Sequence, residues 1–148
     1  MKYQASGEKL LLTFWVGSMW FAGYVVAPVL FNMLDRVTAG NVAGQIFTIS
    51  SYIGLLAGSL LLVSAVFNTS TGNRFGMRFR VLIVMLLIIV IGQFVLQPMM
   101  FELKQTGLEK GSQSAIEFGR LHGVSSILFL INSLLGLVLV LVGVRSSR

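Results

Sequence analysis

Four long apolar stretches, separated by short polar segments, dominate the pattern along this chain. They cover about residues 10–34, 42–67, 81–101 and 121–144, and every Lys, Arg, Asp and Glu lies between them or at the ends. Each stretch reaches the roughly 20 residues that a helix needs to cross a 30 Å hydrocarbon core. Because a charge in that core costs about 2.5–3.5 kcal/mol even on the lenient insertion scale, charge-free stretches mark the spans. The pattern predicts an all-α integral membrane protein, a single domain of residues 1–148 built as a four-transmembrane-helix bundle.

Composition leads to the same expectation. Hydrophobic residues make up 55% of the chain and charged residues 11%, whereas an ordinary soluble domain carries about 25% charged residues. The first stretch is longer than the apolar region of a secretory signal peptide, about 7–15 residues, and it carries bulky aromatic residues where a cleavage site needs small ones. We therefore expect it to be a membrane helix and not a cleaved signal.

The basic residues are distributed unequally between the two sides of the predicted bundle. The side with both termini and the second loop holds seven of the 11 Lys and Arg residues and one acid, while the other side holds four of each sign. By the positive-inside rule, both termini are expected in the cytoplasm, with the chain in the cytoplasmic (inner) membrane. The excess charge then serves topology and attracts anionic headgroups. The expected partner is the lipid bilayer, and no nucleic acid is expected.

Small residues recur along one face of the second span. Gly40 and Gly44 form one G-x-x-x-G pair, and Gly54 and Gly58 form another. Such residues let a second helix backbone approach closely, which matters because lipid supplies no hydrophobic force between helices. We expect this stripe to pack against the first or third span. A homodimer seam and a substrate path are the alternatives, so a homo-oligomer stays open.

The first and third spans each contain a proline near the outer end. Pro28 lies in Ala27-Pro28-Val29-Leu30-Phe31 and Pro98 in Gln97-Pro98-Met99-Met100-Phe101. A proline removes one hydrogen bond within the helix and bends it. The matching placement suggests two helical hairpins related by a parallel repeat, as in some transporters. The alternative is that prolines are simply common near the ends of transmembrane helices.

The fourth span is expected to begin outside the membrane. The segment from Ser114 to Glu117 fits a capping box, in which the two side chains bond each other's backbone N–H groups, and it predicts a helix from Ala115 to Val144. Asn132, near the middle of this helix, is expected to face the interior and to hydrogen-bond a carbonyl group of a neighbouring helix. Gln93 in the third span is expected to line the same interior.

Candidate metal ligands lie near the outer rim. Topology brings His122 to the same membrane level as Met33, Met99 and Met100. One imidazole with thioethers suits Cu(I) or a haem iron with His and Met ligands. The alternative is that the methionines pack flexibly at helix ends and that the histidine donates a hydrogen bond.

The residue content excludes several classes of chemistry. The chain has no cysteine and one histidine, so thiolate chemistry and sites with several imidazoles are excluded. No Ser/His/Asp set or phosphate loop is present, and hydrolysis is not expected. Proton pumps and ion-coupled carriers usually place ionisable residues inside their spans, and these spans contain no Asp, Glu, Lys or Arg.

Several short motifs add a family resemblance. They are Ala27-Pro28-Val29-Leu30-Phe31, Ala39-Gly40, Gly44-Gln45-Ile46-Phe47, Phe118-x-x-x-His122 and Ser125-Ser126. With them the chain resembles domain-of-unknown-function family 4149, small four-helix membrane proteins akin to transmembrane protein 205. The resemblance implies a four-helix membrane protein and brings no catalytic residues. More remotely, the arrangement is similar to CopD copper-resistance domains and to haem-binding membrane protoporphyrinogen oxidases, although the first span here has no histidine.

The sequence therefore predicts a function without catalysis. We expect a non-enzymatic, multi-pass inner-membrane protein that acts as an accessory or as a passive small-solute component, with no cofactor and with an unidentified small-molecule ligand. The alternative is a membrane protein that binds haem or Cu(I) through His122 and the methionines of the outer rim.

Overall fold

A computed structural model describes residues 2–67 and 76–145, and the side chains of residues 6–67 and 76–142. All regular secondary structure in these segments is helical. Two short elements, η1 and η3, are π-helical turns, in which an N–H group bonds the carbonyl five residues earlier. In chain order the elements are α1 (Lys2–Phe21), η1 (Ala22–Val26), α2 (Ala27–Met33), α3 (Arg36–Phe67), α4 (Met77–Ile91), η3 (Gly92–Leu96), α5 (Gln97–Gln105) and α6 (Gln113–Arg145).

These elements join into four long helices. Helix α1 continues through η1 into α2, and α4 continues through η3 into α5. Four segments, each with a mean hydropathy of 1.6 or more, are long and apolar enough to cross a membrane: Ser6–Met33, Arg36–Phe67, Met77–Gln105 and Gln113–Val142. The predicted all-α class with four transmembrane helices is therefore confirmed, and the chain is a multi-pass membrane protein.

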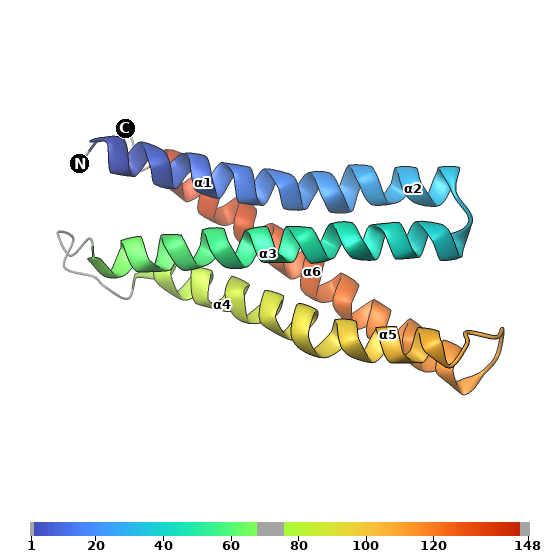
Figure 1. The fold of residues 1–148 in the computed structure, drawn as a ribbon. Helices are drawn as coiled ribbons and strands as arrows, with labels where there is room; N and C mark the ends of the chain where they lie inside the picture. Colours follow the sequence, from blue (N-terminus) through green and yellow to red (C-terminus); the bar gives the residue numbers. More distant parts are fainter. Residues whose placement is uncertain (1, 68–75, 146–148) are drawn as a thin grey trace.

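The four helices pack side by side as a closed ring. Helix α1 lies against α3 and α6, and α4 lies against the same two helices. Both termini lie at one end of the bundle, and the α2–α3 and α5–α6 connections lie at the other (Figure 1). At that far end, α2 packs on α3 while α5 packs on α6. The chain thus forms two antiparallel hairpins that start from the same end.

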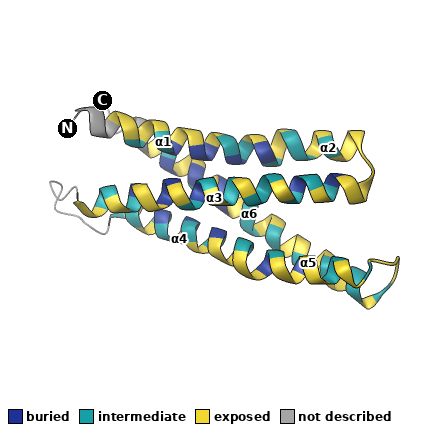
Figure 2. Cartoon of the chain, viewed as in Figure 1, coloured by how far each residue is buried: buried dark blue, intermediate teal, exposed yellow. Residues whose placement is uncertain are grey.

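The core lies where the inner faces of the four helices meet. Trp15 is 1% exposed, and it packs with residues of the other three helices, among them Ala57, Leu82 and Leu139. The outer faces are yellow in Figure 2 and carry many exposed Leu, Ile, Val and Phe side chains. So much exposed apolar surface would be an aggregation hazard in water, whereas in a bilayer it is the surface that contacts lipid.

A π turn precedes each proline. The Ala27 N–H donates to the Ala22 carbonyl, and the Gln97 N–H donates to the Gly92 carbonyl. Pro28 and Pro98 follow directly, each near the start of the next α-helical segment. Since a proline ring clashes with the carbonyl one turn earlier in a regular α-helix, the wider turn lets the helix continue through the proline. The two hairpins therefore share one backbone device at matching positions.

Helix α3 begins at a carboxylate cap. The Oδ1 atom of Asp35 accepts hydrogen bonds from the Val37 and Thr38 N–H groups, each at 3.0 Å. The side chain of Thr38 also bonds this carboxylate. That bond, followed by the backbone bond from Thr38, holds the pKa of Asp35 below its ordinary value of 3.8. The cap satisfies two backbone donors that a helix start otherwise leaves unpaired.

The start of α6 corrects the predicted capping box. The helix begins at Gln113, and Ser112 is the cap, since its Oγ accepts from the Ala115 N–H at 3.2 Å. Ser114 instead donates from its Oγ to the Gly107 carbonyl at 2.9 Å. The reason is the preceding turn, in which Gly107 has a φ of +89° and Gly111 a φ of +87°. These left-handed glycines bring the chain into the helix two residues earlier than the motif indicates.

Candidate functional site

The four residues of the predicted metal site are divided between the two hairpins and between exposed and buried positions. His122 is exposed on α6, with its ring stacked on Phe118 at a centroid distance of 6.1 Å. Met33, 77% exposed, ends α2 on the first hairpin, while Met99 and Met100 lie on the second. Consecutive helix residues do not face each other, and accordingly Met99 is exposed and Met100 buried. Among the described residues, no three His, Cys, Asp or Glu side chains form a group able to hold a metal ion.

The inner half of the glycine stripe lies against two other helices. A Cβ atom added at Gly54 would lie 2.6 Å from Trp15 Nε1 and 2.8 Å from Ile89 Cδ1. One added at Gly58 would lie 2.6 Å from Leu86 Cδ2. Both glycines therefore permit the close approach of α1 and α4 to α3.

The outer half of the stripe has no such neighbour. A Cβ atom added at Gly40 or Gly44 would have no heavy atom within 4 Å. Gln93, the other predicted pathway residue on this side, is half-buried in η3, and this turn packs against α6. The stripe is thus tightly packed near the termini and open near the α2–α3 connection.

Asn132 lies in the interior, as predicted, but it has a different partner. It is 4% exposed, and its Nδ2 donates to the Met19 sulphur at 3.6 Å in place of a helix carbonyl. A thioether is a weak acceptor. The Oδ1 atom of Asn132 is buried and has no hydrogen-bond partner. This side chain therefore holds unused hydrogen-bonding capacity at the centre of the bundle.

Ser133, the next residue, joins α6 to α1 and η1. The Trp20 indole N–H donates to the Ser133 carbonyl at 3.1 Å, and Ser133 Oγ donates to the Leu130 carbonyl at 2.8 Å. Because the serine proton is used in this way, the Tyr24 hydroxyl, 2.8 Å from Ser133 Oγ, is the donor in that pair. Trp20 and Tyr24 are four residues apart, so both polar tips reach the same point on α6.

An aromatic group continues this contact toward α3. The Phe129 ring lies directly over Gly23, where an added Cβ would collide with it. It meets Tyr24 at 5.9 Å and Phe47 of α3 at 5.2 Å between ring centroids. We call the assembly of Trp20, Gly23, Tyr24, Phe129, Asn132 and Ser133 the η1–α6 cluster. Sequence reasoning missed Trp20 and Tyr24 as members, although two hydrogen-bonding aromatic residues at a spacing of four were a usable signal.

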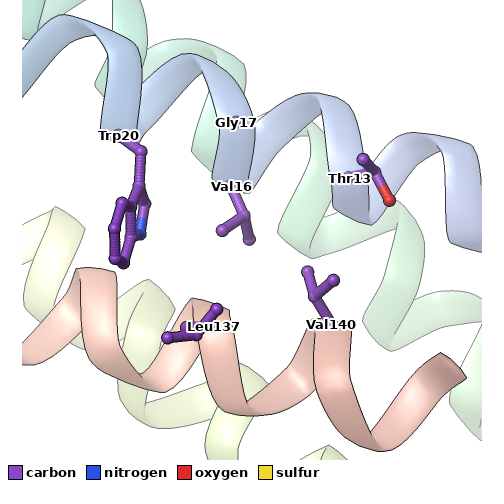
Figure 3. A pocket seen from close by; sticks show the side chains of 6 residues that line it. All are labelled: Thr13, Val16, Gly17, Trp20, Leu137 and Val140. Atoms are coloured by element: carbon purple, nitrogen blue, oxygen red, sulfur yellow. The ribbon is translucent and has the colours of Figure 1, made fainter. Parts of the chain in front are cut away.

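A groove adjoins this cluster between α1 and α6. Its volume is about 280 Å³, and Trp20 lies at one end, with Thr13 and Val140 at the other (Figure 3). The lining residues are Thr13, Val16, Gly17, Trp20, Leu137 and Val140. Apart from the Thr13 hydroxyl and the indole N–H, these side chains are apolar.

The interior offers neutral hydrogen-bonding groups. Among the described residues, Asn132 and Ser133 are the buried polar side chains, and no Asp, Glu, Lys or Arg is buried with them. An amide and hydroxyls can hydrogen-bond a neutral polar molecule, but they carry no charge and do not exchange a proton as a carboxylate does.

Comparison with known proteins identifies the family. The domain of unknown function DUF4149 matches residues 10–109. The chain belongs to the DUF4149 family. An uncharacterized protein of Aquifex aeolicus (strain VF5) is 35% identical to this DUF4149 protein over 121 residues, which is 80% of this chain and 82% of the relative. No solved structure matches it. The domain match ends before α6, so it includes Trp20 and Tyr24 but neither Asn132 nor Ser133.

Proposed function

We propose that this DUF4149 protein is a non-enzymatic, passive small-solute component of the cytoplasmic membrane, with both termini in the cytoplasm. The observation that carries the proposal is the unpartnered Oδ1 atom of Asn132, buried at the centre of the bundle. A buried polar group without a hydrogen bond destabilises the fold, because it has lost its hydrogen bonds to water and the low-dielectric interior does not replace them. A small solute with a hydrogen-bond donor would satisfy it.

The same surroundings favour a neutral solute and passive movement. Coupled carriers use titratable residues to bind the coupling ion or proton, and the described interior offers an amide and a serine hydroxyl. The half-exposed Tyr24, bonded to Ser133, extends these groups toward the surface of the bundle. Water, glycerol and urea are therefore the probes of choice.

Solute flux through proteoliposomes tests this proposal. We expect glycerol or urea permeability above that of protein-free vesicles, measured by stopped-flow light scattering. Asn132→Leu should lower it about tenfold, because a hydrogen bond lost at a buried group corresponds to about 1–3 kcal/mol. The control is Asn32→Leu, the same change at an exposed rim residue. Equal flux in all three samples and in protein-free vesicles would contradict the proposal.

A second variant covers the case in which Asn132→Leu does not fold. Met19→Leu removes the thioether that accepts from Asn132 Nδ2 and keeps the amide itself. We expect it to retain solute flux. A folded Met19→Leu protein without flux would show that the interior amide is not what the solute meets.

The haem or Cu(I) alternative depends on His122. Its exposed position on α6 and the separate location of Met33 give it less support than the interior site. Absorbance after incubation with haemin, and bound copper after incubation with Cu(I), decide between the two functions. A Soret band or bound copper that is lost in His122→Ala would establish the alternative.

The proposed orientation has a direct test, since the chain contains no cysteine. Single cysteines at Ser6 and at Thr106 lie at opposite ends of the bundle, near the termini and in the α5–α6 connection. In intact cells, an impermeant maleimide should label the cysteine at 106 and leave the one at 6 unlabelled. The reverse pattern would place the termini outside the cytoplasm.

A further inference from the structure

The groove between α1 and α6 is open toward the lipid-facing side of the bundle. Thr13, Gly17 and Leu137, three of its six lining residues, are exposed. A Cβ atom added at Gly17 would have no heavy atom within 4 Å, so the missing side chain leaves real space. In a membrane this space faces the acyl chains of lipids. A chain that fills it makes van der Waals contacts that an empty space would not provide.

The walls are held in place on the protein side. The Trp20 indole N–H donates to the Ser133 carbonyl, and this bond fixes the ring at the end of the groove farther from the termini. Val16 is buried, and it packs against the position of Gly136 on α6, so the floor is part of the core. Trp20 and Val16 therefore give the groove fixed walls on the protein side.

The distance from Trp20 to Lys9 along α1 suits one leaflet. Trp20 closes the groove, and Lys9 lies eleven residues before it on α1. Eleven residues of helix rise about 16 Å, and half of the hydrocarbon core is about 15 Å. An acyl chain that ends against Trp20 would thus place its headgroup level with Lys9.

The charge at that level is positive. Lys9 is exposed and lies one helical turn before Thr13, on the same side of α1 as the groove mouth. The neighbouring carboxylate of Glu8 pairs with Arg78 of α4 at 3.0 Å, so its charge is already balanced. A negative headgroup at this level would meet the positive charge of Lys9.

We propose that this groove binds one acyl chain of an anionic phospholipid, with the lipid phosphate paired to Lys9. The site overlaps the η1–α6 cluster at the Trp20 ring alone, and its other lining residues lie outside the cluster. The proposal holds whether or not the protein conducts a solute, because it depends on the lipid-facing side of α1 and α6.

Tryptophan quenching by brominated lipids tests it, since bromine on an acyl chain quenches only an indole that it touches. The chain has two tryptophans, and Trp15 is 1% exposed and so gives a constant background. The full-length protein is placed in vesicles of phosphatidylglycerol and phosphatidylcholine. In one preparation the phosphatidylglycerol is brominated, and in the other the phosphatidylcholine is brominated. We expect Trp20 to be quenched more strongly by the brominated phosphatidylglycerol.

Two variants assign the effect. Lys9→Gln should reduce the preference for phosphatidylglycerol about fivefold, the effect expected of one lysine near an anionic surface, and Lys110→Gln in the α5–α6 connection should leave it unchanged. Gly17→Leu should fill the groove and lower quenching by both lipids, while Gly7→Leu, outside the groove and equally free of neighbours, should not.

Three outcomes would overturn the proposal. Equal quenching by the two lipids would mean ordinary solvation of the helices by lipid. An unchanged preference for phosphatidylglycerol in Lys9→Gln would show that Lys9 does not pair with the lipid phosphate. Weak quenching by both lipids that increases as the protein is diluted would mean that a second copy of the chain covers the groove.

Discussion

The turns η1 and η3 each cover five residues, and one residue separates each from the proline that follows. Their second residues differ. Gly23 in η1 lies under the Phe129 ring, whereas η3 has Gln93, which carries a side chain, at the equivalent position. The prolines and the wide turns are thus common to both hairpins. The glycine is what leaves room for the Phe129 ring over η1.

The third residues of the two turns also differ in their contacts. Tyr24 donates its hydroxyl proton to Ser133 and meets Phe129. Phe94, its counterpart, has no hydroxyl and is 54% exposed, with an edge contact to Tyr52 of α3 at 6.5 Å. The comparison teaches that a proline in a membrane helix creates an irregular turn by local chemistry, while neighbouring helices decide whether that turn becomes a polar site.

The largest effect is expected from a side chain at Gly23. In Gly23→Leu, the new Cβ would collide with Phe129, and forced overpacking costs about 1–3 kcal/mol. We expect a clear loss of thermal stability in detergent, measured by circular dichroism, together with altered tyrosine and tryptophan fluorescence from the disturbed cluster.

The control in the second turn is Gly92→Leu, at the glycine that occupies the first position of η3. A Cβ atom at Gly92 would have no heavy atom within 4 Å, and replacing a glycine inside a helix removes a cost of about 0.5–1 kcal/mol. The melting temperature should therefore stay the same or rise slightly. Equal destabilisation by the two changes would show that both π turns are packed alike, and the comparison would fail.

The fold could be predicted because its signals are local. Charge-free stretches report the membrane directly, so the four spans follow from the positions of charged residues alone. Details at the ends depend on backbone geometry that the pattern does not contain. Ser114 with Glu117 matches a capping motif, yet the left-handed Gly107 and Gly111 make Ser112 the cap.

The candidate site was harder to predict because its contacts are distant in sequence. The Tyr24–Ser133 bond joins residues 109 positions apart, and predicting it requires the rotation and the register of α6 relative to α1. Asn132 was assigned to the interior because an amide is costly in lipid, but the partner it finds there, Met19, cannot be deduced from that rule. The prediction of a metal site uses membrane depth alone, and depth does not tell which way Met99 and Met100 face, of which the first is exposed and the second buried.

A smaller effect is expected when the two turns are made chemically alike at the third residue. Tyr24→Phe removes the hydroxyl that donates to Ser133, and one such hydrogen bond contributes about 1 kcal/mol. The reverse change, Phe94→Tyr, adds a hydroxyl to an exposed ring and should leave the unfolding free energy unchanged. Steric-trap or chemical unfolding in detergent provides the measurement. If Phe94→Tyr lowered the free energy of unfolding more than Tyr24→Phe, the polar contact of Tyr24 would not be what stabilises the first turn.

The smallest effect distinguishes the two connections that follow these turns. Helix α3 is capped by the Asp35 carboxylate and α6 by the Ser112 hydroxyl, so the first cap titrates and the second does not. Because the hydrogen bonds from Thr38 lower the pKa of Asp35 below 3.8, the stability that this cap contributes is complete above pH 3.8. It is lost as the pH falls through the lowered pKa.

In NMR spectra of the detergent-solubilised protein, the amide protons of Val37 and Thr38 should therefore shift with a midpoint below pH 3.8. The Ala115 amide, which donates to Ser112, should show no such transition. Asp35→Asn keeps an oxygen acceptor at the cap and should abolish the titration at Val37 and Thr38 while leaving α3 folded. A midpoint at or above 3.8 would mean that the carboxylate does not hold these donors, because each hydrogen bond to the charged form makes its protonation harder.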